Sequence, residues 1–462
     1  MNSSDLCKKH IYFVGAGGIG MAALERYFAV RGYKVAGYDR TPSALTSALE
    51  SEGIAISFSD DPSEAVPEAF RDPADTLVVY TPAVPSDHPV MRYFADGGFE
   101  TVKRARVLGM VTRSSIALCF AGTHGKTTTS SMAAHILHES PAGCNAFLGG
   151  VLRNYGTNFL LDEASPYSVI EADEYDRSFH QLTPTVAVIT ATDPDHLDIY
   201  GTEEAYLESF AHFTELIRPD GALIIHTGLK LHPRQAASVK TYTYSRDEGD
   251  FHAVNIRRAD GVITFDLVTP TGLITDIQPG VPVEINIENS IAAVAAIYAA
   301  GECDPDCVRR AMASFMGPKR RFEFWLRTPE LSIIDDYAHH PDELRSSIRS
   351  VKALFPEHKL TVAFQPHLYS RTRDFAPQFA AALSEADSVV LLDIYPAREL
   401  PIPGVSSQLI YDGVTAPEKR LIRRVELVDT LRDMKLDVLL TAGAGDIVDL
   451  LPAIVENLTP HA

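Results

Sequence analysis

An apolar run at residues 116–121 leads into a glycine-bracketed loop and then into a helix-forming segment. A buried strand, a loop and a helix in this order suit phosphate binding, because the loop N–H groups and the helix N-terminus both attract anions. Lys126 can reach the outer phosphates of a nucleoside triphosphate, and the Thr127 hydroxyl can bind Mg²⁺. The loop is shorter than the standard G-x-x-x-x-G-K-[ST], since only two residues separate Gly122 from Gly125. The predicted triphosphate site therefore needs support elsewhere in the chain.

The composition excludes some classes of protein. The chain has 462 residues, 45% of them hydrophobic and 22% charged, which suits about three domains of roughly 150 residues each. The formal net charge of −20 argues against general nucleic-acid binding, and it means that an anionic substrate must be held by a local positive cluster. The five cysteines are scattered, and neither a signal-peptide pattern nor an apolar stretch of membrane-spanning length is present. We therefore expect a cytoplasmic protein.

Strand and helix patterns alternate along most of the chain, which predicts an α/β fold with mostly parallel sheets. We expect three domains: a Rossmann-like α/β domain at residues 1–113, a P-loop α/β domain at 114–317 and a second Rossmann-like α/β domain at 318–462. Short β segments with turn signals at 241–283 predict a β appendage on the central domain. The expected strands are residues 10–17, 33–39, 76–80, 100–102, 115–121, 167–172, 186–190, 222–226, 331–335, 359–364, 388–393 and 437–441. The expected helices include residues 18–31, 289–300, 341–354, 374–385 and 446–457.

A second glycine-rich loop lies near the N-terminus, between a predicted strand and a predicted helix. It has the form G-x-G-x-x-G, and its members include Gly15, Gly17, Gly18, Ile19 and Gly20. Asp39 ends the next predicted strand, 19 residues after Gly20. This pattern is typical of a dinucleotide site with the acid on a ribose, but the same N–H groups would suit the pyrophosphate of a UDP-sugar. A tight turn that binds no ligand is the alternative.

Carboxylates follow two predicted strands beyond the phosphate loop. Glu171 lies in the run VIEADEYD, and His196 lies in the run TDPDHLD. Carboxyl ends of neighbouring parallel strands meet at one edge of a sheet, so we expect both clusters to face Lys126. A single loop carboxylate is usually solvated, but two clusters beside a phosphate loop favour metal binding. Thr127, Glu171 and His196 are therefore the candidate Mg²⁺ ligands.

Several short runs occur in the order in which one enzyme family carries them. They are GTHGKT at 122–127, EADE at 171–174, DHLD at 195–198, KRRFE at 319–323 and DDYAHHP at 335–341. On these runs the chain resembles the Mur ligases, the ATP-dependent amino-acid ligases of peptidoglycan synthesis. FQPHLYSRTR at 364–373, YPARE at 395–399 and the N-terminal glycine loop are similar to the branch that adds L-alanine to UDP-N-acetylmuramate. The matches span almost the whole chain.

The resemblance implies that the first domain binds the UDP-sugar, the second binds ATP, and the third closes over ATP and the amino acid. It implies that the lactyl carboxylate of UDP-N-acetylmuramate takes the γ-phosphoryl group of ATP, and that the amine of L-alanine attacks the acyl phosphate, giving ADP and phosphate. Lys126 and the metal would offset the repulsion between two anions. The implied cofactor is Mg²⁺ or Mn²⁺ with ATP as co-substrate, in a bacterial, cytoplasmic monomer or weak homodimer without nucleic-acid or membrane partners.

The site residues that the resemblance implies fall into three groups. The ATP site would comprise Gly122, Thr123, His124, Gly125, Lys126, Thr127, Thr128, Asn286, Asn289, Arg320, Arg321 and Asp336. The amino-acid and muramate site would comprise Tyr337, His339, His367 and Arg371. The catalytic groups would be Lys126, Glu171, His196, His339 and Arg371. In this scheme Arg320 or Arg321 approaches ATP, Asp336 takes its ribose, and the planar donors of Arg371 suit a carboxylate.

Three positions depart from the family pattern, and one of them is Ala191, which replaces an asparagine common before the Asp-His pair. Ile285 stands where relatives often carry histidine, so a ring that would stack on adenine is lost. Leu368 stands where many alanine-adding relatives carry arginine, which leaves Arg371 or Arg373 to hold the alanine carboxylate. A weaker affinity for alanine is the expected consequence.

Other functions stay open on the sequence. A recycling ligase would join an intact tripeptide to UDP-N-acetylmuramate. A nicotinamide-dependent dehydrogenase would use the N-terminal glycine loop but would leave Lys126 and His196 without a role. A non-catalytic UDP-sugar sensor would also have no use for Lys126. The histidines His339 and His340 have a purely structural interpretation too, as polar residues at a helix start that continues with Pro341.

Overall fold

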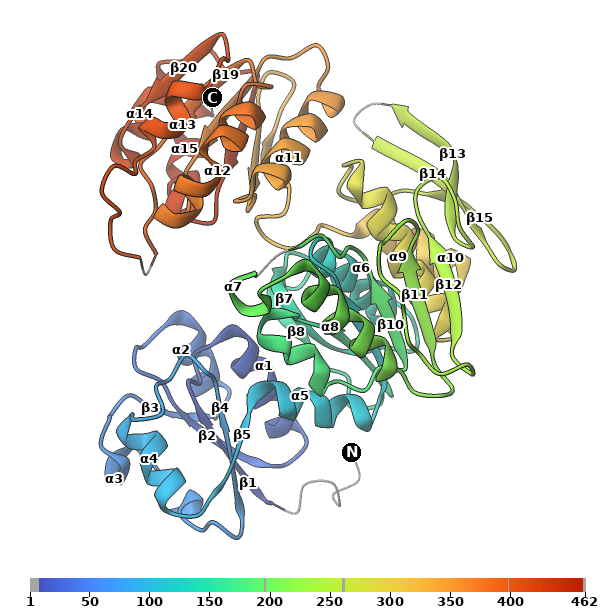
Figure 1. Ribbon diagram of the computed structural model, residues 1–462, viewed down its shortest axis with the longest axis vertical. Helices are drawn as coiled ribbons and strands as arrows, with labels where there is room; N and C mark the ends of the chain where they lie inside the picture. The colour runs from blue at the N-terminus through green and yellow to red at the C-terminus, as the bar shows by residue number, and fades with distance from the viewer. Residues whose placement is uncertain (1–7, 195–196, 260–261, 398, 460–462) are drawn as a thin grey trace. The chain divides into compact units, whose positions relative to one another are not determined.

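Short apolar runs become the strands of parallel sheets, and the segments between them fold into helices that cover both faces (Figure 1). The computed structural model describes residues 8–194, 197–259, 262–397 and 399–459. The chain divides into two compact units. The first comprises Met1–Ile256, Thr264–Gln278 and Ile287–Phe315, and the second comprises Arg257–Ile263, Pro279–Asn286 and Met316–Ala462.

The N-terminal sheet of the first unit is a parallel Rossmann-like sheet with the order β3-β2-β1-β4-β5. Its strands are β1 (His10–Val14), β2 (Lys34–Tyr38), β3 (Ala55–Ser57), β4 (Thr76–Tyr80) and β5 (Glu100–Lys103). Its helices are α1 (Ile19–Val30), α2 (Ala44–Ser51), α3 (Pro62–Ala65), α4 (Pro89–Asp96) and α5 (Arg104–Arg113), with a 3₁₀ turn η1 (Glu68–Phe70). The strand order reverses at β1, and ligands of such sheets bind outside the carboxyl ends at this point. The N-terminal glycine loop follows β1 directly.

The central sheet has the order β12-β11-β10-β6-β9-β7-β8, and its strands pair in parallel except for β7 with β8, which are antiparallel. Its strands are β6 (Ile116–Ala121), β7 (Asn145–Leu152), β8 (Thr157–Leu160), β9 (Tyr167–Glu171), β10 (Val186–Ile189), β11 (Ala222–His226) and β12 (Lys240–Tyr244). The helical segments are α6 (Lys126–His138), η2 (Tyr175–Gln181), α7 (Leu197–Tyr200), α8 (Glu203–Glu215), α9 (Ile285–Ala299) and α10 (Pro305–Ser314). A small sheet of β13 (His252–Ala259), β14 (Val262–Thr269) and β15 (Gly272–Ile277) forms the expected β appendage.

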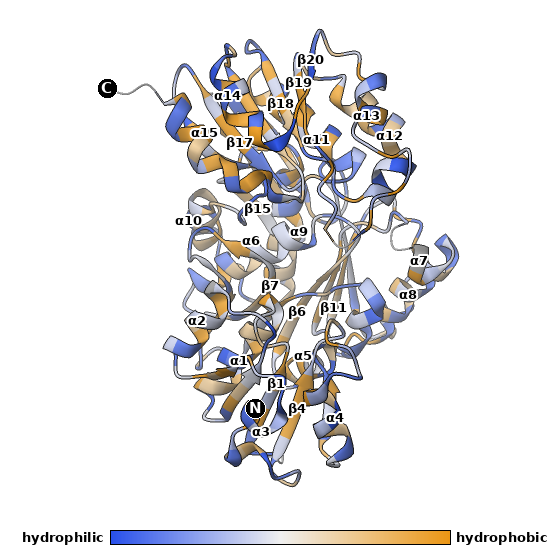
Figure 2. Ribbon diagram, turned by 90° about the vertical axis from the view of Figure 1, so that its left-hand side faces the viewer, coloured by the Kyte–Doolittle hydropathy of each residue, from blue (hydrophilic) through white to orange (hydrophobic). Residues whose placement is uncertain are grey.

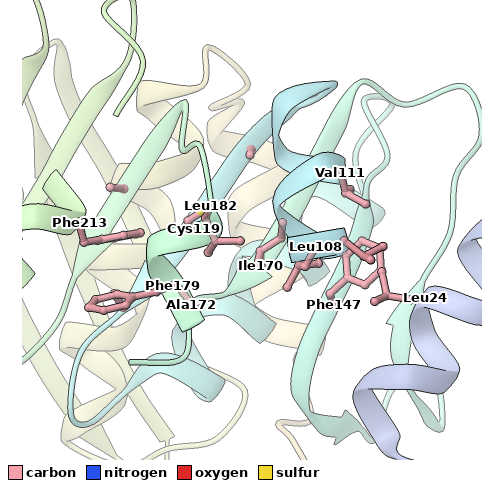
Figure 3. Close-up of a cluster of buried hydrophobic side chains, with 14 of the residues drawn as sticks. Leu24, Leu108, Val111, Cys119, Phe147, Ile170, Ala172, Phe179, Leu182 and Phe213 are labelled. Carbon is pink, nitrogen blue, oxygen red and sulfur yellow. The ribbon is translucent and has the colours of Figure 1, made fainter. Parts of the chain in front are cut away.

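One hydrophobic core joins the two sheets of the first unit. Tyr27 on α1 lies against Phe147 on β7, with ring centroids 5.4 Å apart. Figure 3 shows Leu24, Leu108 and Phe147 gathered in this cluster, with Cys119 farther along it. Burial raises the pKa of the Cys119 thiol, so this cysteine is an apolar packing residue rather than a nucleophile.

The second unit contains a sheet with the order β16-β17-β21-β18-β19-β20, parallel except for β16 with β17. Its strands are β16 (Glu323–Arg327), β17 (Ser332–Asp336), β18 (Leu360–Phe364), β19 (Ser388–Leu391), β20 (Glu418–Leu421) and β21 (Val438–Ala442). Its helical segments are α11 (Pro341–Leu354), α12 (Tyr369–Leu383), α13 (Gln408–Gly413), η3 (Arg424–Glu426), α14 (Leu427–Arg432), η4 (Asp446–Leu450) and α15 (Leu451–Leu458). Figure 2 shows hydrophobic residues on the strands and mixed colours on the surrounding helices.

The twelve strands expected from the sequence are present, most of them shorter by one to three residues than expected. The β7–β8 hairpin was not expected, because its glycine-rich sequence lacks a clear period. Helix α12 begins at Tyr369 rather than at residue 374, and the last expected helix divides into η4 and α15. Among the described residues, no helix combines the length and the hydropathy needed to cross a membrane.

Glu25 on α1 is an unusual charge-bearing side chain, because it is 0% exposed. Neither of its carboxylate oxygens has a hydrogen-bond partner within the described part of the chain. Burial raises the pKa of Glu25 well above its ordinary value, Arg26 opposes this rise, and Asp39 and Glu52 add to it. The side chain is therefore stabilised as the neutral acid.

We expect the Glu25→Gln variant to lose one pH-dependent contribution to stability. The folded-state pKa is raised, so wild-type stability falls as the pH rises from the unfolded value toward the folded value, by at most about 1.4 kcal/mol per pH unit. Urea unfolding of both proteins between pH 4 and pH 8 measures the difference. A difference in unfolding free energy that does not change with pH would contradict a neutral, buried Glu25.

Candidate active site

The phosphate loop is held in place by backbone conformations that only glycine adopts easily. Gly122 has φ 141° and Gly125 has φ 83°. A Cβ atom on Gly122 would lie 2.2 Å from the Thr190 hydroxyl oxygen, so the loop packs directly on the end of β10. The Thr190 hydroxyl donates to the His124 carbonyl, and the Thr123 N–H donates to the Ala191 carbonyl at 3.0 Å. Ordinary side chains would therefore dislodge the loop.

The N-terminus of α6 is suited to binding an anion. Gly125 is the N-cap and supplies no side chain, and the first turn consists of Lys126 and three threonines without an acid. The first N–H groups of a helix have no partner within the helix, and the helix dipole adds partial positive charge there. Thr127 and Thr128 are both half-buried at this end. This helix start therefore suits an anion, and phosphate binding there stays a prediction.

The Lys126 ammonium is paired with a buried carboxylate. Its Nζ atom lies 2.8 Å from Glu174 Oε1 and also donates to the Gly122 carbonyl. The Lys126 side chain is 15% exposed and that of Glu174 is 2% exposed. Burial raises the pKa of Glu174, and the nearby Lys126 charge opposes this rise. Glu174 was absent from the predicted site residues, although its place in the EADE run was the signal for it.

Thr127 and Glu171 are brought together at the carboxyl edge of the central sheet. The Thr127 hydroxyl donates to Glu171 Oε1 at 2.9 Å, and the Gly149 N–H donates to Glu171 Oε2 at 2.9 Å. This pair of oxygen ligands fits Mg²⁺, which prefers oxygen donors. The third candidate ligand, His196, lies outside the described residues. Among the residues that are described, no group of three His, Cys, Asp or Glu side chains forms a metal-binding cluster.

The two predicted adenine residues have different surroundings. Asn289 on α9 is 7% exposed, and its Oδ1 atom accepts the Thr129 hydroxyl at 3.2 Å. A Cβ atom on Gly125 would lie 3.0 Å from the same Oδ1, so Asn289 lies against the phosphate loop. Asn286 belongs to the second unit, where its Nδ2 atom donates to the Val281 carbonyl at 3.0 Å. A role in adenine binding stays a prediction for both.

The N-terminal glycine loop is also a constrained turn. Gly15 has φ 92°, and a Cβ atom there would lie 2.4 Å from Thr81 Cγ2. Asp39 Oδ2 accepts the Gly17 N–H at 2.7 Å, and its Oδ1 accepts the Thr41 N–H at 3.2 Å. The Asp39 carboxylate therefore fixes the loop, and its predicted contact with a ribose is untested.

An arginine that the sequence did not single out stands at the same helix start. Gly18 is the N-cap of α1, and Ile19 is 44% exposed. A Cβ atom on Gly20 would lie 2.6 Å from a guanidinium nitrogen of Arg104. Arg104 is the first residue of α5 and directly follows β5, so its guanidinium lies at the carboxyl end of that strand, beside the glycine loop. A guanidinium beside loop N–H groups suits a pyrophosphate.

Arg320 and Arg321 in the second unit have different environments. Arg320 Nε lies 3.1 Å from Asp335 Oδ2, and its other nitrogens donate to the carbonyls of Gly443 and Gly445. The Arg320 side chain is 16% exposed, and Asp335 is fully buried. Both guanidinium carbons lie near the Tyr337 ring centroid, at 5.0 Å for Arg320 and 5.4 Å for Arg321, but Arg320 is also held by Asp335. Of the two predicted arginines, Arg321 is the better candidate for contact with a phosphate.

Asp336 is engaged by the backbone. Its two oxygens accept the N–H groups of Phe322 and Ala338, both at 2.8 Å. Burial raises the pKa of Asp336 to about 6, against the opposing charge of Arg321. Asp336 therefore links the backbone at Phe322 to the backbone just after Tyr337, and binding of a ribose stays a prediction.

Tyr337, His339 and His367 form a chain of rings beside Arg371. The Tyr337 and His339 centroids are 5.2 Å apart, and those of His339 and His367 are 6.2 Å apart. Burial is the largest cause that lowers the pKa of both histidines, and the Arg371 charge lowers both further. The cluster therefore combines neutral imidazoles with the cations Arg371 and Arg321, which suits a carboxylate ligand. Arg373, by contrast, is about half exposed and paired with Asp374.

We expect His367 to titrate with a pKa of about 4 rather than near 6.5. Because the folded-state pKa is depressed, the stability that depends on neutral His367 is lost as the pH falls from about 6.5 toward 4. The imidazole carbon and proton shifts measured by NMR between pH 3.5 and pH 8 check this. The Arg371→Gln variant should raise the pKa of His367, and an unchanged midpoint would refute the charge effect.

Comparison with known proteins places the whole chain in one family. Three family models match in succession: the one described as "Mur ligase family, catalytic domain" at residues 10–115, "Mur ligase middle domain" at 120–297 and "Mur ligase, glutamate ligase domain" at 320–454. They confirm the expected three-domain α/β architecture, while the boundaries after residues 113 and 317 stay predictions.

Relatives match along their full length. A protein of Phocaeicola vulgatus named UDP-N-acetylmuramate–L-alanine ligase is 58% identical over 96% of this chain and 97% of its own length. A Porphyromonas gingivalis protein of the same name is 50% identical over 97% and 99% of the two chains. The crystal structure of a UDP-N-acetylmuramate–alanine ligase from Thermotoga maritima is 27% identical, with a TM-score of 0.77 over 97% of this chain and 98% of that one. The chain described here is a member of the Mur ligase family.

Proposed function

We propose that this protein is an ATP-dependent ligase that joins L-alanine to the lactyl carboxylate of UDP-N-acetylmuramate and releases ADP and phosphate. The observation that carries the proposal is the 58% identity, over 96% of the chain, to a protein named for this activity. The product is a peptidoglycan precursor. Because ATP and the UDP-sugar are cytoplasmic metabolites, we also propose a cytoplasmic location, with the chain acting as a monomer or weak homodimer.

The first half of the reaction brings two anions together, and the phosphate loop suits this task. The N–H groups of Gly122 to Gly125 and of the first turn of α6 would hold the phosphates. Lys126 would exchange its contact with Glu174 for contacts with phosphate oxygens, and so stabilise charge on the transferring group. Asn289, at the base of the loop, would contribute to binding of the nucleotide. Arg104 and the N-terminal glycines would hold the UDP pyrophosphate.

Thr127 and Glu171 would hold a Mg²⁺ or Mn²⁺ ion, since their oxygens already lie 2.9 Å apart at the loop. His196 is proposed as a ligand of a second ion on the sequence alone. Bound metal would neutralise charge on the phosphate oxygens and on the acceptor carboxylate.

The second half of the reaction needs a bound amino acid and a group that accepts a proton from its ammonium. Arg371 would hold the alanine carboxylate through its planar donors. The His339 Nδ1 atom lies 3.0 Å from the Tyr337 carbonyl oxygen, so the tautomer with Nδ1–H leaves Nε2 as a proton acceptor. Burial lowers the pKa of His339, which keeps the ring neutral at pH 7. His367 and Tyr337 would line the same site.

A tripeptide-recycling ligase is the nearest competing function. A murein peptide ligase of Psychrobacter arcticus shares the fold at a TM-score of 0.64, but it is only 20% identical. The relatives at 50–58% identity carry the alanine-ligase name instead. A dehydrogenase or a UDP-sugar sensor would leave the pairing of Thr127 with Glu171 and the Lys126 site without a purpose.

We expect ADP release only when UDP-N-acetylmuramate, Mg²⁺ and an amino acid are all present. The measurement is an ADP-release screen across alanine, serine, glycine and the L-Ala-γ-D-Glu-diaminopimelate tripeptide, with mass spectrometry of the conjugate. Alanine should give the highest kcat/KM. A tripeptide conjugate as the main product would favour the recycling enzyme, and ADP release without the sugar would indicate a plain ATPase.

The Lys126→Ala variant should lose ATP-dependent ligation by at least about a thousandfold, because the transferring phosphoryl group loses its main protein cation. Binding of UDP-N-acetylmuramate, followed by calorimetry, should persist because it uses the N-terminal loop. The matched control is Lys230→Ala, which removes an exposed lysine of the same unit that pairs with Glu203. Ligation by the Lys126 variant near the control rate would refute the assignment.

A further inference from the structure

Helix α12 begins without a cap of its own. Its N-cap residue is Leu368, whose side chain cannot accept a hydrogen bond, and its first turn contains no acidic residue. Leu368 also has φ 70° and ψ 138°, a conformation that is strained for a residue with a side chain. The first N–H groups of a helix need acceptors, so this end depends on groups from elsewhere in the chain.

Glu399 supplies that acceptor from 29 residues away. The Ser370 N–H donates to Glu399 Oε2 at 3.0 Å, and the Ser370 hydroxyl donates to Glu399 Oε1 at 2.5 Å. Burial raises the pKa of Glu399, but hydrogen bonds from Ser370 and Tyr369 and the nearby His367 outweigh this and hold the pKa below its ordinary value. The carboxylate is therefore ionised at the positive end of a helix, where a negative charge is stabilised.

The segment that carries Glu399 also contacts His367 and its neighbours through Tyr395. The Leu368 N–H donates to the Tyr395 carbonyl at 3.0 Å, and the Tyr395 N–H donates to the Pro366 carbonyl at 2.8 Å. The Tyr395 ring stacks on His367 at 5.8 Å between centroids and 17° between planes. The strained Leu368 and the start of α12 are thus held by one loop. His367 and Arg371 stand on either side of the Ser370 contact.

We propose that Glu399 is a positioning residue for the amino-acid substrate: by capping α12 through Ser370, it fixes Arg371 and His367 in the geometry that receives the amino acid's carboxylate. The inference rests on the proposed function for the identity of that substrate. Arg371 is the next residue after Ser370, in the same first turn, so a loosened cap moves the guanidinium directly. Glu399 does not need to touch the substrate.

The test compares Glu399→Gln with Asp374→Asn. The glutamine has the size of the native side chain but lacks its charge and one acceptor oxygen. Asp374 lies on the same helix and pairs with Arg373 at 2.7 Å, so its variant controls for the loss of a carboxylate near α12. Steady-state kinetics give kcat and KM for alanine, ATP and UDP-N-acetylmuramate, and thermal unfolding gives the stability of each protein.

We expect Glu399→Gln to raise the KM for alanine about tenfold, as two charge-assisted hydrogen bonds are weakened. The KM values for ATP and UDP-N-acetylmuramate should stay within about twofold, and Asp374→Asn should match the wild type in all of them. The His367 and Tyr395 NMR signals should shift in the glutamine variant. Should that variant not fold, Glu399→Asp, which keeps the charge on a shorter side chain, should show the same selective increase.

Two results would overturn the inference. One is a folded Glu399→Gln protein with an unchanged KM for alanine. The other is a proportional loss for all three substrates that follows the loss in thermal stability, because this would make Glu399 a purely structural residue. A failure of the proposed function would be visible earlier, as wild-type protein without alanine-dependent ADP release, and it would overturn both proposals.

Discussion

Carboxylates that accept backbone N–H groups hold several loops at the carboxyl ends of the parallel strands, and they occur in each part of the candidate site. Asp39 holds the N-terminal glycine loop, and Glu171 binds the Gly149 N–H beside the phosphate loop. Asp336 and Glu399 do the same in the second unit. The chain has a net charge of −20, and unpaired carboxylates that faced the site would repel anionic substrates. Hydrogen bonds from backbone N–H groups stabilise these carboxylates and also restrain the loops that donate them.

Much of the fold could be predicted from the sequence, because buried strands have continuous apolar runs and the glycine loops have fixed spacings. The pairing of Thr127 with Glu171 followed from the rule that strand ends meet at one edge. What could not be predicted depends on contacts between distant residues. Helix α12 starts early because Glu399 caps it, and Arg104 reaches Gly20 through the packing of α5. No local pattern contains that information.

The second unit shows how neighbouring residues of one type can acquire different roles. Arg320 and Arg321 are adjacent and both lie near the Tyr337 ring, yet Arg320 also pairs with Asp335 and donates to two backbone carbonyl groups. The order of residues alone does not distinguish these two arginines, because the difference depends on which side chain points into the unit. Arg371 and Arg373 differ in the same way.

The pairing of Lys126 with Glu174 has a consequence for selectivity. An incoming anion must compete with a buried carboxylate 2.8 Å from the ammonium. Chloride or acetate, with one charge and little further contact, offers no more than Glu174 already provides. A polyphosphate has several charges and would also accept hydrogen bonds from the neighbouring backbone amides. It would therefore displace Glu174 from the Lys126 ammonium. The loop would therefore bind small anions weakly, although no structural element excludes them by size.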